Sequence, residues 1–159
     1  MRTIRMVEPQ DYAQLMKIEN EIWTNDNSPV LHWYENVEEF QEKMQNATIV
    51  VALENEKILG FLNLSQMSKL ESNRFSMLIG IGVAKNAQSS GVGRNLISWV
   101  KEYAREHGKH KIGLRVLSTN EKAIRFYEKN GFIEEGRLRD EFFIDGKFVD
   151  DVFMACFLE

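Results

Sequence analysis

The sequence is poor in the features that mark secreted, metal-binding or membrane proteins. Its 159 residues include one cysteine, Cys156, which cannot form an intrachain disulfide and belongs to no Cys/His metal cluster. No apolar run approaches the ~20 residues that span a bilayer, and the start, Met1–Arg5, lacks the apolar segment of a signal peptide. We therefore expect a soluble, cytoplasmic protein without a metal, in which Cys156 is a small apolar residue inside a strand.

The chain also lacks an excess of basic residues. Its formal net charge is −4, whereas proteins that bind a phosphate backbone normally present a basic face, so we expect no nucleic-acid partner. The charge is uneven: residues 1–71 hold 12 acidic and 6 basic side chains, and residues 72–159 hold 12 and 14. This asymmetry would suit a cationic substrate and an anionic cofactor, but a solvated surface explains the same numbers.

Length and apolar content predict one folded domain over residues 1–159. A chain of this length buries roughly 70% of the surface that its unfolded form exposes. Ile, Leu, Val and Phe exceed the roughly 20% below which a charged chain tends to stay disordered. The sequence shows no internal repeat and no linker.

Hydrophobic periodicity predicts an α+β domain with a mixed sheet. The segments that read as strands are Thr3–Val7, Thr48–Leu53, Ile58–Leu64, Arg74–Val83, Ile112–Leu117, Phe132–Arg137, Glu141–Ile144 and Val149–Leu158. Helices are predicted from Pro9 to Ile22, over Val37–Met44, over Gly91–His107 and over Asn120–Lys129. The stretch Trp23–Tyr34 has turn formers and no clear period, so we expect a loop there, or a loop with a short helical piece.

The most informative stretch joins the strand that ends at Val83 to the helix that begins at Gly91. The first N–H groups of a helix have no partner inside it and carry the positive end of its dipole. After a loop of small residues they form an anion site, typically for a phosphate, although a plain strand–turn–helix connection uses the same glycines. A nucleoside-triphosphate loop does not fit, because Gly93 is followed by Arg94, and a dinucleotide fingerprint starting at Gly80 lacks its third glycine.

A second group of residues is Asn120-x-x-Ala123-x-x-x-Tyr127-x-x-x-Gly131-Phe132. Ala123 and Tyr127 share one helical face, and Asn120 stands at the helix start. Tyr127 could be a core residue, or it could aim its phenol into a cleft as a proton donor.

Together the two motifs resemble the GCN5-related N-acetyltransferase (GNAT) family. Gln88-x-x-Gly91-x-Gly93 opens a helix, and Asn120, Tyr127 and Gly131-Phe132 follow about thirty residues later. The order of elements across nearly the whole chain is also similar to that family. The tail resembles the bacterial branch that contains amino-acid and other small-amine N-acetyltransferases, through Gly131-Phe132-x-x-Glu135-Gly136 and Asp145-Gly146-Lys147-Phe148-Val149-Asp150-x-x-x-Met154.

The resemblance implies a mixed, mostly antiparallel sheet of six to seven strands flanked by about four helices. The strand ending at Val83 would be bulged and splayed from the strand Ile112–Leu117, with acetyl-CoA between them. Tyr127 would protonate the departing thiolate, and Asn120 would contact the pantetheine. The implied acetyl-CoA contacts are Ile81, Gly82, Val83, Gln88, Ser89, Ser90, Gly91, Val92, Gly93, Arg94, Asn120, Ala123 and Tyr127.

The sequence is less informative about the general base and the acceptor. Many family members carry a glutamate on the strand before the loop, but Phe75–Val83 contains no acid. Candidates elsewhere are Glu71, Glu19, Glu21, Asp26 and His32. The acceptor would lie against the acidic first half of the chain, where Glu19, Trp23, Trp33 and Tyr34 are candidate contacts, although core or dimer packing also explains the aromatic residues.

The sequence therefore predicts an acetyl-CoA-dependent N-acetyltransferase that acts on a small primary amine, such as an amino acid, a polyamine-like or a drug-like amine. A protein N-terminus or lysine is the alternative acceptor. A CoA-binding sensor without turnover is the alternative from another class. Family members are often dimers, so a homodimer is possible.

Overall fold

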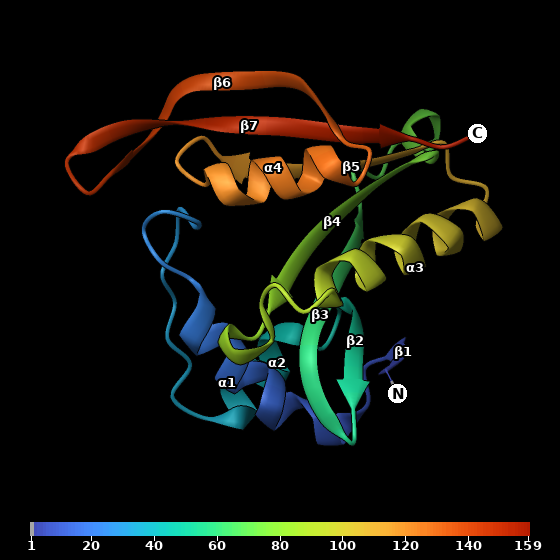
Figure 1. Ribbon diagram of the computed structural model, residues 1–159, viewed down its shortest axis with the longest axis vertical. Helices are drawn as coiled ribbons and strands as arrows, with labels where there is room; N and C mark the ends of the chain where they lie inside the picture. The colour runs from blue at the N-terminus through green and yellow to red at the C-terminus, as the bar shows by residue number, and fades with distance from the viewer. Residues whose placement is uncertain (1) are drawn as a thin grey trace. The chain divides into compact units, whose positions relative to one another are not determined.

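A computed structural model describes residues 2–159, which form a seven-stranded sheet with the strand order β1-β2-β3-β4-β5-β7-β6 (Figure 1). The strands are β1 (Arg2–Met6), β2 (Thr48–Glu54), β3 (Lys57–Gln66), β4 (Ser76–Val83), β5 (Lys111–Leu117), β6 (Ile133–Ile144) and β7 (Lys147–Phe157). The α-helices are α1 (Tyr12–Ile22), α2 (Val37–Met44), α3 (Val92–Glu106) and α4 (Glu121–Lys129). Short 3-10 turns are η1 (Pro9–Asp11), η2 (Glu71–Asn73) and η3 (Lys85–Ala87). The mixed α/β fold predicted from the sequence is confirmed.

Strand directions agree with a mixed, mostly antiparallel sheet. β1 pairs with β2, β2 with β3, β5 with β7 and β6 with β7, all antiparallel. β4 and β5 pair in parallel, through Ser76–Leu78 against Lys111–Gly113. No helix within residues 2–159 combines the length and the apolar character that crossing a bilayer would need.

Contacts divide the chain into two compact units. Among the described residues, unit 1 comprises residues 2–22, 32–65 and 79–102, and unit 2 comprises residues 23–31, 66–78 and 103–159. β4 and α3 each contribute to both units. The prediction of a single domain stays a prediction.

The core of unit 1 forms because β2 and β3 are nearly continuous apolar strands. Val50, Val51 and Leu62 are fully buried, as expected for strands covered on both faces. The turn between these strands has Asn55 and Glu56 at positive φ, a geometry that suits a tight antiparallel hairpin.

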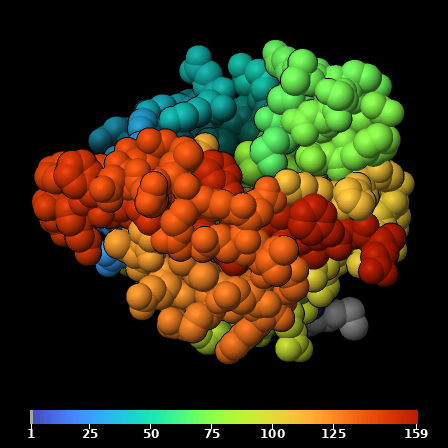
Figure 2. Space-filling model, turned by 90° about the horizontal axis from the view of Figure 1, so that it is seen from above, coloured from blue at the N-terminus to red at the C-terminus, as the bar shows by residue number. Residues whose placement is uncertain are grey.

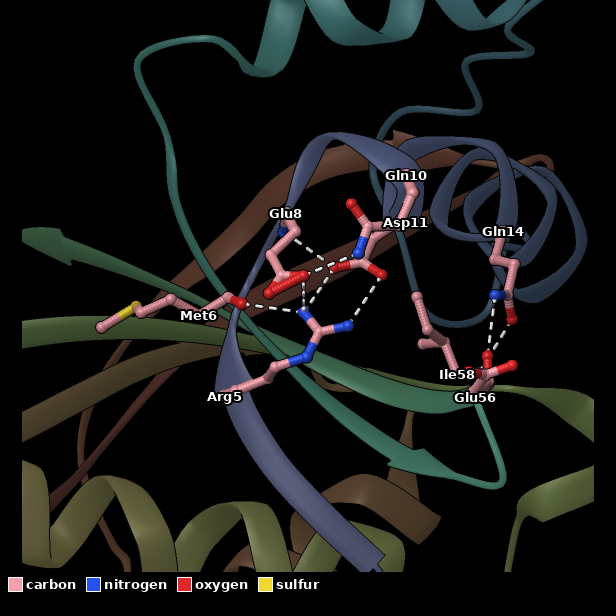
Figure 3. Close-up of polar contacts among 8 residues, drawn as sticks. All are labelled: Arg5, Met6, Glu8, Gln10, Asp11, Gln14, Glu56 and Ile58. Carbon is pink, nitrogen blue, oxygen red and sulfur yellow. Dashed lines mark hydrogen bonds and ion pairs between the residues drawn. The ribbon is translucent and has the colours of Figure 1, made fainter.

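Polar contacts anchor α1 to the strands of unit 1 (Figure 3). The Arg5 guanidinium donates to both carboxylate oxygens of Asp11, at 2.7 and 3.1 Å, and the Glu8 N–H donates to Asp11 at 2.7 Å. Gln14 bridges the hairpin turn: its amide donates to the Glu56 carbonyl at 3.1 Å and accepts from the Ile58 N–H at 2.8 Å. These bonds fix the direction in which α1 leaves β1.

Asp11 is the charged group in this network that is most thoroughly removed from water, with 2% of its surface exposed. Burial by itself raises the pKa of Asp11, but the hydrogen bonds from Arg5 and Glu8 outweigh it and hold the pKa below the usual range. Asp11 is therefore a carboxylate that the fold both buries and satisfies.

The core of unit 2 lies between α4 and the strands β5, β7 and β6. Ile112, Val152 and Met154 are buried on the strands, and Phe132 is buried just after α4. The β6–β7 hairpin exposes an aromatic pair, Phe143 and Phe148, with ring centroids 5.1 Å apart. This hairpin, orange to red in Figure 2, lies at the surface.

Three sequence predictions need correction. The strand predicted from Arg74 begins at Ser76, because Glu71–Asn73 form a 3-10 turn that Arg74 closes through its N–H. The two strands predicted between Phe132 and Ile144 are one strand, β6, whose register against β7 shifts twice; Asp140 at φ 52° lies within the second shift. The predicted helix Gly91–His107 is α3, Val92–Glu106.

Candidate functional site

The loop between β4 and α3 has a defined backbone, which hydrogen bonds and two left-handed residues hold. Ser89 and Gly91 have φ of 65° and 89°, and the Ser90 hydroxyl donates to the Ala87 carbonyl. The Gln88 side chain donates back to the Val83 carbonyl at 3.2 Å. The loop therefore turns tightly out of β4 and enters α3 in a fixed direction.

The start of α3 offers donors to a ligand. The first recurrent helical bond joins the Asn95 N–H to the Gly91 carbonyl at 3.0 Å, so the N–H groups of Val92, Gly93 and Arg94 precede the repeat of the helix. Ser89, Ser90 and Arg94 are exposed, and no acidic residue stands in the first turn. This arrangement matches the backbone requirement of an anion site at a helix N-terminus.

Arg2, which belongs to neither sequence motif, contacts this loop from β1. Its guanidinium donates to the Ser90 carbonyl and to the Asn95 side-chain oxygen, both at 2.8 Å. A positive charge thus stands against the outside of the loop, 3.4 Å from where a Cβ on Gly91 would lie. Only the folded topology brings residues 2 and 90 together, so spacing in the sequence gives no signal for it.

Glycines on β3 and β4 allow a helix to pack closely on each face of the sheet in unit 1. A Cβ at Gly60 would lie 2.9 Å from a methyl of Val92, so α3 packs directly on this backbone. A Cβ at Gly82 would lie 2.5 Å from the Phe61 ring and 2.7 Å from the Ile22 side chain at the end of α1. Gly82 therefore marks a close approach of neighbouring side chains to the strand backbone, as glycine inside a strand often does.

Gly80, two residues earlier on the same face of β4, is different. It is exposed, and the one neighbour among residues 2–159 that a Cβ at this position would meet within 4 Å is the Asn63 Cβ, at 3.9 Å. Between Gly80 and Gly82, Ile81 is half-buried, as is Val83. The bulge and the splay expected for this strand stay predictions.

In unit 2, Asn120 caps α4. Its side-chain oxygen accepts a hydrogen bond from the Ala123 N–H at 3.2 Å, which satisfies one of the first donors of the helix. The family resemblance implies that Asn120 and Ala123 contact acetyl-CoA, and the structure shows that they also bond to each other as cap and first turn of α4. The carboxamide N–H₂ of Asn120 is not used by the cap.

Tyr127 lies on the buried face of α4. Its ring packs against Phe126 and Phe132, with centroids 5.4 and 5.7 Å away. Burial raises the pKa of Tyr127 above the ordinary value of about 10, so the phenol is neutral at physiological pH.

The Tyr127 hydroxyl makes no hydrogen bond to any other residue between 2 and 159. In the same range, the one fully buried side-chain oxygen or nitrogen without a partner is Asn63 Oδ1, so the Tyr127 hydroxyl is not sealed from solvent. A neutral phenol with a buried ring and an unused hydroxyl is able to act as a hydrogen-bond or proton donor.

The loop after α1 also contributes to unit 2. The Thr119 hydroxyl, next to the α4 cap, donates to the Asp26 carbonyl at 2.9 Å. Trp23 belongs to this unit and is half-buried. The predicted loop Trp23–Tyr34 is confirmed, since it contains neither helix nor strand.

Other acceptor candidates lie in unit 1. Tyr34 is buried: its ring packs on Phe40 at 4.9 Å, and Lys43 stands over it at 5.6 Å. Burial, together with the charges of Glu19 and Glu39, raises the pKa of Tyr34. Glu19 thus lies close to Tyr34, whereas Trp33 is 62% exposed.

The remaining candidates for a general base are at the surface. Glu71 is exposed and pairs with Arg74 at 3.4 Å. Glu21 and Asp26 are exposed, and His32 contacts Glu39 at 3.3 Å. Glu19, half-buried beside Tyr34, is the one carboxylate of the predicted set that has a partly enclosed environment.

The sequence matches the Acetyltransferase (GNAT) family over residues 12–132. Its curated relatives include the spermidine N(1)-acetyltransferase of Vibrio cholerae, 29% identical over 93% of this chain and 88% of that protein. Another is the L-methionine sulfoximine/L-methionine sulfone acetyltransferase of Salmonella typhimurium, 26% identical over 99% of this chain and 95% of that protein. The chain therefore belongs to the GNAT family and is an N-acetyltransferase.

Solved structures agree with this assignment. The protein smu.2055 from Streptococcus mutans is 30% identical, with a TM-score of 0.90 over 99% of both chains. The yncA protein from Salmonella typhimurium, solved with its cofactor acetyl-CoA, has a TM-score of 0.85 at 23% identity and covers 100% of this chain and 95% of its own. The GNAT fold predicted from the two sequence motifs is confirmed.

Proposed function

We propose that this N-acetyltransferase transfers the acetyl group of acetyl-CoA directly to the primary amine of a small molecule. The observation that carries the cosubstrate assignment is the loop of residues 88–94, where positive φ angles meet the first-turn N–H groups of α3 that precede its first helical hydrogen bond. The bound acetyl-CoA of the yncA structure supports the same cosubstrate.

In this proposal the pyrophosphate binds the N–H groups of Val92, Gly93 and Arg94, with Gln88, Ser89, Ser90 and Gly91 shaping the loop. The pantetheine bonds to the backbone at Ile81 and Val83, with Gly82 between them, and contacts Asn120 and Ala123. Helix N-termini stabilise anions through these donors and through the helix dipole. The Arg2 guanidinium adds a positive charge to the loop without occupying its donors.

Tyr127 is proposed as the general acid. Acetyl transfer breaks the thioester C–S bond and forms a C–N bond, so the nitrogen loses one proton and the sulfur gains one. The Tyr127 hydroxyl gives its proton to the sulfur, and the phenolate regains one from the nitrogen. The unused hydroxyl of Tyr127 supports this role. Burial raises the pKa of Tyr127, which keeps the phenol protonated before transfer but also makes it a weaker acid.

The acceptor is proposed to be a small amine because the relatives named above act on spermidine and on methionine derivatives. The carboxylates of Glu19 and Glu39 lie near Tyr34 in unit 1, and such acidic groups favour a cationic amine. Glu19, Trp23, Trp33 and Tyr34 are the proposed contacts of the acceptor. Glu19, acting directly or through water, is the proposed base that converts the ammonium form of the acceptor to the neutral amine before the transfer step.

The test is a thiol-release assay with acetyl-CoA and a panel of spermidine, L-methionine sulfone, L-methionine and a short peptide with a free N-terminus. Release that depends on a small amine supports the proposal. A peptide that outperforms the small amines would move the acceptor to proteins, and binding of acetyl-CoA without release would indicate a sensor.

The anion loop has its own test by calorimetric titration with acetyl-CoA. Gly93→Asp places a negative charge in the first turn of α3, where it suits the helix but repels a phosphate. Gly93→Ala adds a Cβ without the charge. We expect Asp to weaken binding at least ~10-fold more than Ala does; equal Kd values for the two variants would contradict a pyrophosphate at this loop.

A further inference from the structure

Asn63 on β3 carries a buried polar atom that nothing in the fold satisfies. Its Oδ1 is the one fully buried side-chain oxygen or nitrogen in residues 2–159 that has no hydrogen-bond partner. A buried acceptor left unpaired is costly, and native proteins usually pair such groups. The position therefore requires a reason beyond folding.

The surroundings of Asn63 offer that acceptor no partner from its own sheet. Asn63 lies opposite Ile49 in the β2–β3 register, and Phe61 is the preceding residue on the same face of β3. Both of these side chains are buried and apolar. A polar side chain here gains nothing from its immediate neighbours.

The opposite side of Asn63 is open because of Gly80. A Cβ on Gly80 would meet the Asn63 Cβ at 3.9 Å, within ordinary contact, so the two positions are neighbours on one face. Gly80 is exposed, and its backbone lies outside the left-handed region. The missing side chain leaves space into which the Asn63 amide can turn, since the last torsion of asparagine is soft.

The contrast with Gly82 shows that this space is not a general property of the strand. Gly82 faces the same side of β4, but the Phe61 ring and Ile22 fill its position. The opening is therefore confined to Gly80 and lies beside Asn63, whose Oδ1 is the one fully buried side-chain oxygen or nitrogen without a partner in residues 2–159.

We propose that the hollow over Gly80 receives the reacting amine of the acceptor and that Asn63 Oδ1 accepts a hydrogen bond from its N–H. This inference rests on the proposed function, because it takes Ile81 and Val83 as the backbone contacts of pantetheine. The pyrophosphate would lie beyond Val83, so the thioester end of acetyl-CoA reaches back along β4 toward Gly80. Asn63 would then hold an N–H and leave the nitrogen lone pair free for the thioester carbon.

The specificity that follows is for primary amines. A nitrogen that gives one N–H to Asn63 and loses another during transfer needs two hydrogens in its neutral form. Secondary amines, which have one, should be poor acceptors. In this proposal the preference for primary over secondary amines comes from a hydrogen-bond acceptor on β3, Asn63 Oδ1, and not from a charged side chain.

The test compares Asn63→Leu and Gly80→Ala with the wild type, using the best small amine of the panel. Asn63→Leu keeps the branching at Cγ and the number of side-chain heavy atoms but removes the acceptor, and Gly80→Ala puts a methyl group into the hollow. For both variants we expect the amine KM to rise, or kcat/KM to fall, by at least ~10-fold, with the Kd of acetyl-CoA unchanged. Unchanged amine kinetics in Asn63→Leu would overturn the inference.

Stability separates this role from a structural one. Asn63→Leu breaks no hydrogen bond, so its Tm should equal or exceed that of the wild type. Asn20→Leu is the matched comparison: its amide bonds the N–H and the carbonyl of Tyr34, at 2.9 and 3.0 Å, and its Tm should fall. A fall in Tm for Asn63→Leu that matched the fall for Asn20→Leu would assign Asn63 to the fold instead.

A binding measurement keeps the inference separate from the proposed function. Spermidine and L-methionine sulfone are titrated calorimetrically into protein saturated with CoA. If the wild type binds an amine without turnover, the proposed function fails, and loss of that binding in Asn63→Leu still supports the inference. Equal amine affinity in wild type and variant, or no amine binding by the folded wild type, overturns it.

Discussion

The substitution Tyr127→Phe isolates one hydroxyl group. The Tyr127 ring packs between Phe126 and Phe132, and phenylalanine preserves that packing. The hydroxyl makes no hydrogen bond within residues 2–159, so its removal leaves no donor or acceptor unpaired. We therefore expect the free energy of unfolding to change by less than about 0.5 kcal/mol.

Activity should respond very differently. A positioned general acid contributes about 10²–10⁴-fold to a rate, so kcat should fall at least ~10-fold while the Kd of acetyl-CoA stays within a few-fold. The assay is thiol release at saturating acetyl-CoA and amine, together with a single-turnover measurement that confirms acetyl transfer as the slow step. Tyr12→Phe is the matched control, since Tyr12 is an edge-on partner of Phe40 in unit 1.

The pH dependence sharpens this prediction. Burial raises the pKa of Tyr127, so the acid stays protonated at and above pH 10 and wild-type kcat should show no alkaline decline below that pH. The raised pKa also links the stability of the folded protein to pH, because the folded state favours the neutral phenol. This contribution to the free energy of unfolding is complete below the unfolded pKa of about 10 and is lost as the pH rises toward the folded pKa. An unchanged kcat in Tyr127→Phe, measured where chemistry is slow, would refute the role.

Three further predictions concern stability. Gly82→Ala should lower the free energy of unfolding by about 1–3 kcal/mol and the melting temperature by about 3–10 °C, because its Cβ would overlap Phe61 and Ile22. Gly80→Ala is the control and should melt like the wild type. Arg5→Met should cost about 2–4 kcal/mol in urea unfolding at pH 7, because it leaves Asp11 buried and unpaired. Since the folded pKa of Asp11 is lowered, that difference is present above pH ~4 and should shrink as the pH falls below it. Ser89→Gly should raise the free energy of unfolding by up to about 1 kcal/mol, because glycine adopts the φ of 65° without strain, and the Kd of acetyl-CoA should change by no more than about two-fold. A less stable variant would show that Ser89 is not strained.

Local patterns allowed most of the fold to be predicted, because apolar periodicity and capping residues act over a few positions. Val37–Met44 was predicted at its observed bounds, and Asn120 proved to be the cap of α4. The errors lie where the chain conforms to a partner: β6 continues past Arg137 because β7 pairs with it despite two register shifts. Periodicity within one segment carries no information about its partner's length.

The candidate site divides in the same way. The loop of residues 88–94 could be found because glycine at positive φ is a local requirement. The roles of Arg2 and Asn63 could not be predicted, because they depend on residues that are distant in sequence. Arg2 contacts Ser90 and Asn95, and Asn63 is a neighbour of Gly80. Two glycines on β4 look alike in the sequence, and only the packing distinguishes the filled position at Gly82 from the open one at Gly80.

The raised pKa of Tyr127 also constrains how its proton can move. A typical thiol has a pKa near 8.5 and an ordinary phenol one near 10, so proton transfer from the phenol to a free thiolate is uphill by at least about 2 kcal/mol. Burial of Tyr127 increases that gap. Protonation of the sulfur should therefore accompany C–S cleavage and the return of a proton from nitrogen. A solvent deuterium isotope effect on wild-type kcat is expected, and it should be absent in Tyr127→Phe; an equal effect in both would show that another group carries the proton.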